Sequence, residues 1–228
     1  MLFILKETIF LLNKKRGVEI VKTDDSSRIS VTIGKTALKP QGHPTSVRFE
    51  KQTANVYLVM DTSGSMVGDK LEQAKKGIMD FAKDALRKEY AVGLISFNTT
   101  ARHLCEPTYD IGLLKNQIRA MNAIGSTNMA EAIRMAHHHL RRPDTIQVIV
   151  IATDGMPDSA HDALNEATNA KKDNIDIITI GTDDADQEFL KRLATRAELG
   201  KKVTREVFSS AISSASNLLP PPKSITKH

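Results

Sequence analysis

The sequence has no tryptophan and a single cysteine, Cys105, among its 228 residues. One cysteine excludes an intramolecular disulfide bond, the cross-link on which small secreted domains usually depend. The chain is long enough to bury the core of one ordinary domain without such a bond. We therefore expect a protein of a reducing compartment, located in the cytoplasm.

Long hydrophobic runs are also missing. The first apolar stretch, Leu2 to Leu12, is interrupted by Lys6 and Glu7 and is followed by basic residues, which reverses the order found in a secretory signal. A membrane-spanning helix needs about 20 consecutive, mainly apolar residues, and no segment provides them. We expect neither an export signal nor a membrane span.

The excess of positive charge is small and unevenly placed. The net charge is +5, and residues 1–50 hold nine Lys or Arg against five Asp or Glu, so the remainder of the chain is close to neutral. Nucleic-acid binding requires a dense basic face with groups beside it that stack on bases or read them. A solvated surface explains the surplus, and no nucleic-acid partner is expected.

From residue 55 onward, apolar strands alternate with amphipathic helices. The runs "NVYLVMD" and "TIQVIVIATDG" are typical of strands covered on both faces. The segment "DKLEQAKKGIMDFAKDAL" has apolar residues at helical spacing. This alternation predicts an α/β fold with a doubly wound, mainly parallel sheet and helices on both faces. The segment "FNTTARHL", close behind the strand "AVGLISFN", indicates one antiparallel edge strand.

The chain divides into three segments by composition. Residues 1–50 are expected to form a small β-rich extension, in which "GVEIVKTDDSSRISVTIGK" predicts two strands around a turn and Leu2–Leu12 fits either a helix or a strand. The main domain is expected over 51–219. Two prolines and a glycine make Lys39–Ser46 the expected linker, and residues 220–228 are expected to be an extended, proline-rich tail.

Oxygen-bearing side chains gather at the ends of the expected strands. In a doubly wound sheet, ligands bind outside the carboxyl ends of the strands. The loops "DTSGS" and "TDG" both begin at such ends, and the loop "GSTN" opens a helix between them in sequence. These loops are expected to bring five residues to one edge: Asp61, Ser63, Ser65, Thr127 and Asp154.

An all-oxygen set of this kind suits a hard divalent ion such as Mg²⁺ or Mn²⁺. Alternate side chains of an extended segment point the same way, so Asp61, Ser63 and Ser65 can face one ion. Hydroxyl ligands are neutral and leave the ion much of its positive charge. Such an ion attracts a carboxylate from outside, which predicts recognition of a partner protein's Asp or Glu.

The motifs "DTSGSM", "GSTNMAEAI" and "ATDGMPD", in this order, resemble the three loops of the metal-ion-dependent adhesion site (MIDAS) of von Willebrand factor type A (VWA) domains. The resemblance covers roughly Asn55 to Leu219. It implies a Rossmann-like fold, Mg²⁺ or Mn²⁺ bound by the five residues named above, and protein binding without catalysis. Because flanking cysteines and an export signal are lacking, the chain is most similar to intracellular prokaryotic members, which work with AAA+ ATPases, metal-insertion complexes or stress-response operons.

Two other functions stay open from the residues. One is a structural scaffold acting through residues 1–50. The other is a magnesium-dependent phosphatase or hydrolase with Asp61 as nucleophile, although such an enzyme needs an acidic residue where Ser63 stands. Consecutive helix positions diverge by about 100°, so the run His137–His139 is interpreted as a solvated helix end. Cys105 is interpreted as an inert small residue.

Overall fold

The computed structural model describes the main chain of residues 2–5, 8–11, 18–22, 29–33, 47–51, 53–141, 145–222 and 224–227, with side chains over 53–141 and 145–222. The chain forms two compact units, one of Met1–Gln52 with Lys223–His228 and one of Thr53–Pro222. The linker predicted at Lys39–Ser46 lies outside the described residues.

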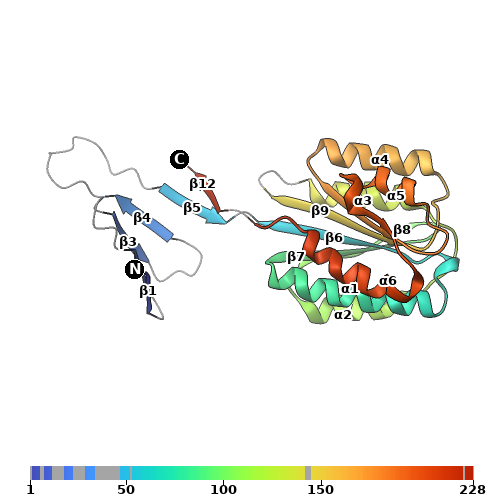
Figure 1. The fold of residues 1–228 in the computed structure, drawn as a ribbon, viewed down its shortest axis with the longest axis horizontal. Coiled ribbons are helices and arrows are strands. Elements are labelled where there is room, and N and C mark those ends of the chain that lie inside the picture. Colours follow the sequence, from blue (N-terminus) through green and yellow to red (C-terminus); the bar gives the residue numbers. More distant parts are fainter. Residues whose placement is uncertain are drawn as a thin grey trace. The chain divides into compact units, whose positions relative to one another are not determined.

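The larger unit is built on a six-stranded sheet (Figure 1). Its strand order is β11-β10-β9-β6-β7-β8, and all neighbours are parallel except the pair β7 and β8. The predicted mainly parallel sheet with one antiparallel edge strand is therefore confirmed. The strands are β6 (Ala54–Asp61), β7 (Tyr90–Phe97), β8 (Ala101–Thr108), β9 (Ile146–Thr153), β10 (Asp176–Gly181) and β11 (Gly200–Lys202).

Helices cover both faces of this sheet (Figure 1). Helices α1, α2 and α6 pack on one face, and α3, α4 and α5 pack on the other. Strand β6 is buried along its whole length because its side chains alternate between the two cores. The helices are α1 (Asp69–Arg87), α2 (Ile111–Ala120), α3 (Met129–Leu140), α4 (Ala160–Lys172), α5 (Gln187–Leu193) and α6 (Phe208–Ser214).

Short 3₁₀ turns complete the larger unit at four places. Helix α6 is followed by the 3₁₀ turn Ala215–Leu218. The segment "KKVTREV" is divided between β11 and the 3₁₀ turn Arg205–Val207. The other two turns are Gly64–Met66 and Ala197–Leu199.

A glycine on β7 makes room for a large side chain from the central strand. A Cβ atom at Gly93 would lie 2.4 Å from Cε1 of Tyr57, so only glycine leaves space for this ring. Tyr57 is fully buried, and its hydroxyl group reaches the side chains of β8. The ring therefore crosses β7 to link the centre of the sheet with its antiparallel edge.

The smaller unit contains a four-stranded antiparallel sheet of order β12-β5-β4-β3 and a separate β1-β2 hairpin. Strands β3 and β4 pair with each other within "GVEIVKTDDSSRISVTIGK", and the described residues of Leu2–Leu12 form two strands. Strand β12 lies in the expected tail and pairs with β5. The larger unit is thus inserted in sequence between two paired strands. The strands are β1 (Leu2–Leu5), β2 (Thr8–Leu11), β3 (Val18–Lys22), β4 (Ile29–Ile33), β5 (Val47–Lys51) and β12 (Ser224–Lys227).

Candidate metal centre

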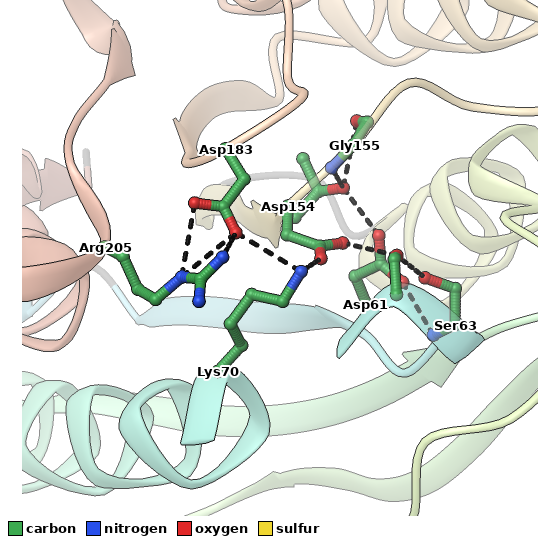
Figure 2. Close-up of polar contacts among 9 residues, drawn as sticks. Asp61, Ser63, Lys70, Asp154, Gly155, Asp183 and Arg205 are labelled. Carbon is green, nitrogen blue, oxygen red and sulfur yellow. Dashed lines mark hydrogen bonds and ion pairs between the residues drawn. The ribbon is translucent and has the colours of Figure 1, made fainter. Parts of the chain in front are cut away.

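Asp61 is the last residue of β6, at the carboxyl edge of the sheet (Figure 2). Its neighbour β9 ends at Thr153, directly before Asp154. Both aspartates are almost completely buried, with 0% and 1% of their surface exposed. Two parallel strands thus deliver two carboxylates to one edge, because adjacent parallel strands end on the same side.

A chain of hydrogen bonds joins four of the five predicted residues. The Oδ1 atom of Asp61 accepts the main-chain N–H of Ser63 at 2.8 Å. The hydroxyls of Ser63 and Ser65 lie 3.0 Å apart, and Ser65 Oγ donates to Asp154 Oδ1 at 2.8 Å. Asp61, Ser63, Ser65 and Asp154 therefore form one continuous cluster of oxygen atoms.

The two serines converge by a different local geometry from the one expected. Ser63 has extended main-chain angles, but a 3₁₀ turn begins at Gly64 and contains Ser65. The alternation of an extended segment therefore explains only the first step, from Asp61 to Ser63. The tight turn then brings Ser65 round to the same side, where its hydroxyl meets Asp154.

Thr127 lies in a loop that is attached to the same edge. The N–H of Gly64 donates to the carbonyl of Gly125 at 2.9 Å, which joins the two loops. Gly125 has φ +82°, and a Cβ atom there would lie 2.4 Å from Oγ1 of Thr99, so this contact requires glycine. Among the described residues, no hydrogen bond joins the Thr127 side chain to the other four predicted residues.

The main chain of Thr127 is held by the loop after β9. Its N–H donates to Oδ1 of Asp158 at 3.0 Å, and its carbonyl accepts the N–H of Asp158 at 3.0 Å. Ser159 caps the N-terminus of α4, because its hydroxyl accepts the N–H of Asp162.

A basic side chain that the sequence analysis did not single out lies against the carboxylates (Figure 2). Lys70, in the first turn of α1, forms ion pairs with Asp154 and with Asp183, the latter at 3.2 Å. Arg205 pairs with the same Asp183, at 2.6 Å from its Nη2 atom. Asp183 follows β10 at the same sheet edge, so the rule that predicted Asp154 could have found it.

At this centre, burial and polar contacts shift the pKa values of the ionisable side chains in opposite directions. Burial raises the pKa of Asp61 to about 6, although hydrogen bonds from Thr153 and Ser63 act to lower it. Burial also acts to lower the pKa of Lys70, but its contacts with Asp154 and Asp183 outweigh that effect and raise it. The hydrogen bond from Arg205 lowers the pKa of Asp183.

The donor set fits a hard divalent cation. It offers two buried carboxylates and two hydroxyls, and the oxygens of Ser63, Ser65 and Asp154 already lie at hydrogen-bonding distances along a chain. A cation would also offset the cost of burying the charge of Asp61, which the raised pKa reports. Lys70 engages Oδ2 of Asp154, which leaves Oδ1 facing Ser65.

Three exposed apolar side chains belong to the loops around this centre. Val67 follows the 3₁₀ turn that contains Ser65, Ile124 precedes Gly125, and Met156 comes two residues after Asp154. The N–H of Ile124 donates to the carbonyl of Thr62 at 2.9 Å, which holds it near the end of β6. We call Val67, Ile124 and Met156 the apolar rim.

A Rossmann-like sheet with two buried acids and nearby hydroxyls at its carboxyl edge defines a class, that of α/β domains with a candidate metal-dependent binding site. The sequence matches the model of the von Willebrand factor type A domain over residues 55–217. The chain therefore belongs to the VWA domain family, whose members are typically binding modules with a MIDAS and are usually not catalytic.

Curated relatives are inter-alpha-trypsin inhibitor heavy chains. The chain is 32% identical over 158 residues to heavy chain H2 of Mesocricetus auratus, a match covering 61% of this chain and 17% of the relative. It is 31% identical over 132 residues to heavy chain H4 of Bos taurus, covering 52% and 14% respectively. The chain thus spans less than a fifth of the length of these relatives.

Solved structures show the same fold at low identity. The vWF domain of the type V pili tip protein Mfa5 from Porphyromonas gingivalis has a TM-score of 0.67 at 17% identity, covering 74% of this chain and 95% of that one. Mussel proximal thread matrix protein 1 with a zinc-occupied MIDAS has 0.62 at 16%, covering 73% and 46%. Manganese-loaded Plasmodium vivax TRAP protein has 0.64 at 17%, covering 78% and 79%.

Proposed function

We propose that this protein is a binding module that docks an acidic side chain of a partner protein onto a divalent ion, Mg²⁺ or Mn²⁺. The observation that carries the proposal is the hydrogen-bonded cluster of oxygens around two buried aspartates at the carboxyl edge of the sheet. The residues proposed to hold the ion are Asp61, Ser63, Ser65, Thr127 and Asp154.

The ion would supply a positive charge, and a partner's carboxylate would complete its coordination. The chain's own residues prepare the place for it. Thr153 and the N–H of Ser63 hold the Asp61 carboxylate in position, and Lys70 restrains that of Asp154. The exposed apolar rim, Val67, Ile124 and Met156, offers contacts to apolar residues beside the partner's acid.

The second candidate function is hydrolysis of a phosphate ester through an aspartyl-phosphate intermediate. One observation favours testing it. Lys70 is a cation beside the carboxylates, as such an enzyme needs near a phosphate. However, it pairs with Asp154 and Asp183, and Ser63 stands where a second acid is required. Turnover of a phosphate ester by wild type, with loss in Asp61→Ala, would favour the enzyme over the binding module.

The setting expected from the sequence stays a prediction. We propose a cytoplasmic VWA protein of the intracellular prokaryotic type, with a partner in an AAA+ ATPase or stress-response complex. The free, buried Cys105 agrees with a reducing compartment. No helix in the described part of the chain is long and apolar enough to cross a bilayer. Cell fractionation with an antibody to the protein tests the location: recovery in a membrane or external fraction would contradict it.

Partner capture tests the proposed function. We would immobilise the protein and recover bound proteins from a lysate of its source with Mg²⁺, with EDTA, and with Asp61→Ala. The matched control is Asp80→Ala, which removes an aspartate that pairs with Lys83 on the surface of α1. Proteins retained with Mg²⁺ by wild type and Asp80→Ala, and lost in the other two conditions, are expected. Equal retention in all conditions would contradict metal-dependent docking. It would favour the alternative function, a structural scaffold that acts through residues 1–50.

A further inference from the structure

A second group of metal-binding side chains lies on β8 and α3. His103 and Glu106 come from β8, and His139 comes from the last turn of α3. One ligand atom from each residue can be chosen so that all three lie within 4.8 Å of one another. None of the three belongs to the candidate metal centre around Asp61. We call them the histidine cluster.

Hydrogen bonds already organise this cluster. Nδ1 of His139 lies 2.8 Å from Oε1 of Glu106. The hydroxyl of Tyr57 donates to the other carboxylate oxygen, Oε2, at 2.9 Å and lies 2.8 Å from Nε2 of His103. Because the Tyr57 ring is buried over Gly93, the hydroxyl is a rigid anchor for both residues. In metal sites, hydrogen bonds from a group that does not itself bind the metal commonly orient the ligands, and the Tyr57 hydroxyl is placed to do this.

The spacing of the three ligand atoms suits a small tetrahedral ion. Metal–ligand distances of about 2.0–2.2 Å place neighbouring ligands of a tetrahedron about 3.4 Å apart. The Glu106 oxygen Oε1 lies 2.8 Å from Nδ1 of His139 and 3.8 Å from Nε2 of His103. The two separations that involve Glu106 therefore lie on either side of this value.

One rearrangement is needed. The rings of His103 and His139 are stacked, with centroids 4.1 Å apart and an angle of 3° between their planes. A metal ion lies in the plane of each imidazole that it binds, so parallel stacked rings cannot share one ion. Rotation of either ring about its Cβ–Cγ bond opens the stack, and 24% and 27% of these side chains are already exposed.

The protonation states favour a cation. Burial and then the neighbouring His139 lower the pKa of His103, which favours the neutral imidazole. For Glu106, burial acts to raise the pKa, but the hydrogen bond from Tyr57 and the nearby histidines outweigh it and lower the pKa. An anionic carboxylate beside a neutral imidazole is the state that binds metal without first losing a proton.

We propose that His103, Glu106 and His139 form a second metal site, selective for Zn²⁺ and similar imidazole-binding ions. Two imidazoles and a carboxylate leave one position for water or a partner's group. Mg²⁺ prefers oxygen ligands, so the two sites differ in the ions that they take. The zinc would fasten the last turn of α3 to β8, and α3 begins two residues after Thr127. The proposal does not depend on the Asp61 centre.

From the sequence, the run His137–His139 is interpreted as a solvated helix end because consecutive side chains of a helix diverge. The structure agrees that they do not converge with one another: His137 pairs with Asp173, at 2.7 Å. His139, however, meets His103 and Glu106 from another element, so the solvated helix end is the wrong description for this one residue. Only the tertiary fold brings positions 36 residues apart together.

Metal binding in a background without the first centre tests the proposal. In Asp61→Ala we expect one equivalent of Zn²⁺ by equilibrium dialysis, and visible absorption bands of tetrahedral Co²⁺ on titration with that ion. Adding His103→Gln, His139→Gln or Glu106→Gln should weaken binding at least about tenfold, and Tyr57→Phe about tenfold. The matched control is His161→Gln, an exposed histidine of α4 that contacts Asn165.

Circular dichroism of each metal-free variant checks that the fold is intact, and Glu106→Gln serves if a histidine variant unfolds, because this carboxylate is 56% exposed. Zn²⁺ bound equally by all variants, or less than one equivalent in Asp61→Ala, would overturn the proposal. With Asp61 present, the histidine variants should bind Mn²⁺ like wild type. Loss of Zn²⁺ binding at the histidine cluster can therefore be distinguished from loss of Mn²⁺ binding at the Asp61 centre.

Discussion

The hydroxyl of Ser65 donates a hydrogen bond to Oδ1 of Asp154 at 2.8 Å, across 89 positions in sequence. Ser65 lies in the 3₁₀ turn after β6, and Asp154 follows the neighbouring strand β9. This contact joins two loops at the carboxyl edge of the sheet and closes the cluster of oxygens proposed to hold a divalent ion.

Ser65→Ala should weaken Mn²⁺ binding at least about tenfold, because it removes one oxygen and the restraint on Asp154. Ser65 is exposed, so the free energy of unfolding of the metal-free protein should change by less than about 0.5 kcal/mol. Isothermal titration calorimetry and urea denaturation measure the two effects. Ser210→Ala, which removes an exposed hydroxyl of α6, is the control; equal affinity in both variants would exclude Ser65 from the site.

Lys70→Gln should strengthen Mn²⁺ binding about threefold to tenfold. The ammonium group pairs with Asp154 and Asp183, so it both competes for a carboxylate and repels an incoming cation. The same substitution should destabilise the metal-free protein, since the buried Asp154 loses its cationic partner and Asp183 keeps only Arg205. Lys83→Gln, which removes an exposed lysine paired with Asp80, should change neither quantity. Weaker Mn²⁺ binding in Lys70→Gln would contradict the competition.

The metal-free protein should become less stable as pH rises from about 4 to about 6. Asp61 has a pKa of about 6 in the folded state against 3.8 when unperturbed, so the folded state holds its proton more tightly than the unfolded state does. At about 1.4 kcal/mol for each pH unit, Asp61 lowers the free energy of unfolding by about 3 kcal/mol at pH 7. The groups facing it are Thr153, Ser63 and the charged pair of Asp154 with Lys70.

Asp61→Asn should therefore raise the stability of the metal-free protein at pH 7, remove this part of the pH dependence and abolish Mn²⁺ binding. Urea denaturation in EDTA at several pH values measures the first two effects. If the variant is less stable than wild type at pH 7, burial of the charged Asp61 carboxylate does not destabilise the metal-free fold.

Gly93→Ala should destabilise the fold by about 1–3 kcal/mol, because the added Cβ would lie 2.4 Å from the buried Tyr57 ring. Gly155→Ala is the matched control: nothing lies within 4 Å of a Cβ atom placed there. Thermal denaturation of both variants measures the difference. Equal melting temperatures would mean that the ring moves aside without cost, and Tyr57 would then be no rigid anchor for the histidine cluster.

Much of the fold was predictable because the apolar runs report burial directly. A strand such as β6, buried on both faces, has to be continuous in apolar residues, and its end is visible at Asp61. The rule that ligands gather at carboxyl ends then predicted that Asp61 and Asp154 lie at one edge. The convergence of Ser63 and Ser65 was also expected, although a 3₁₀ turn produces it.

The contacts that the sequence did not reveal all join elements far apart in the chain. Lys70 and Arg205 meet at Asp183 because α1 and the turn after β11 both lie beside the end of β10. His139 has no partner within its own helix that would mark it as a metal ligand; its neighbours on β8 are 33 and 36 residues away. Periodicity reports the face on which a residue lies, but not which residue faces it.

Anomalous scattering from a crystal soaked in Mn²⁺ locates the ion itself and so tests the proposed metal centre. We expect a peak at the carboxyl edge, within about 2.2 Å of the Ser63 and Ser65 hydroxyls and close to Asp61 and Asp154. Absence of a peak there at saturating Mn²⁺, or a peak confined to other residues, would contradict it.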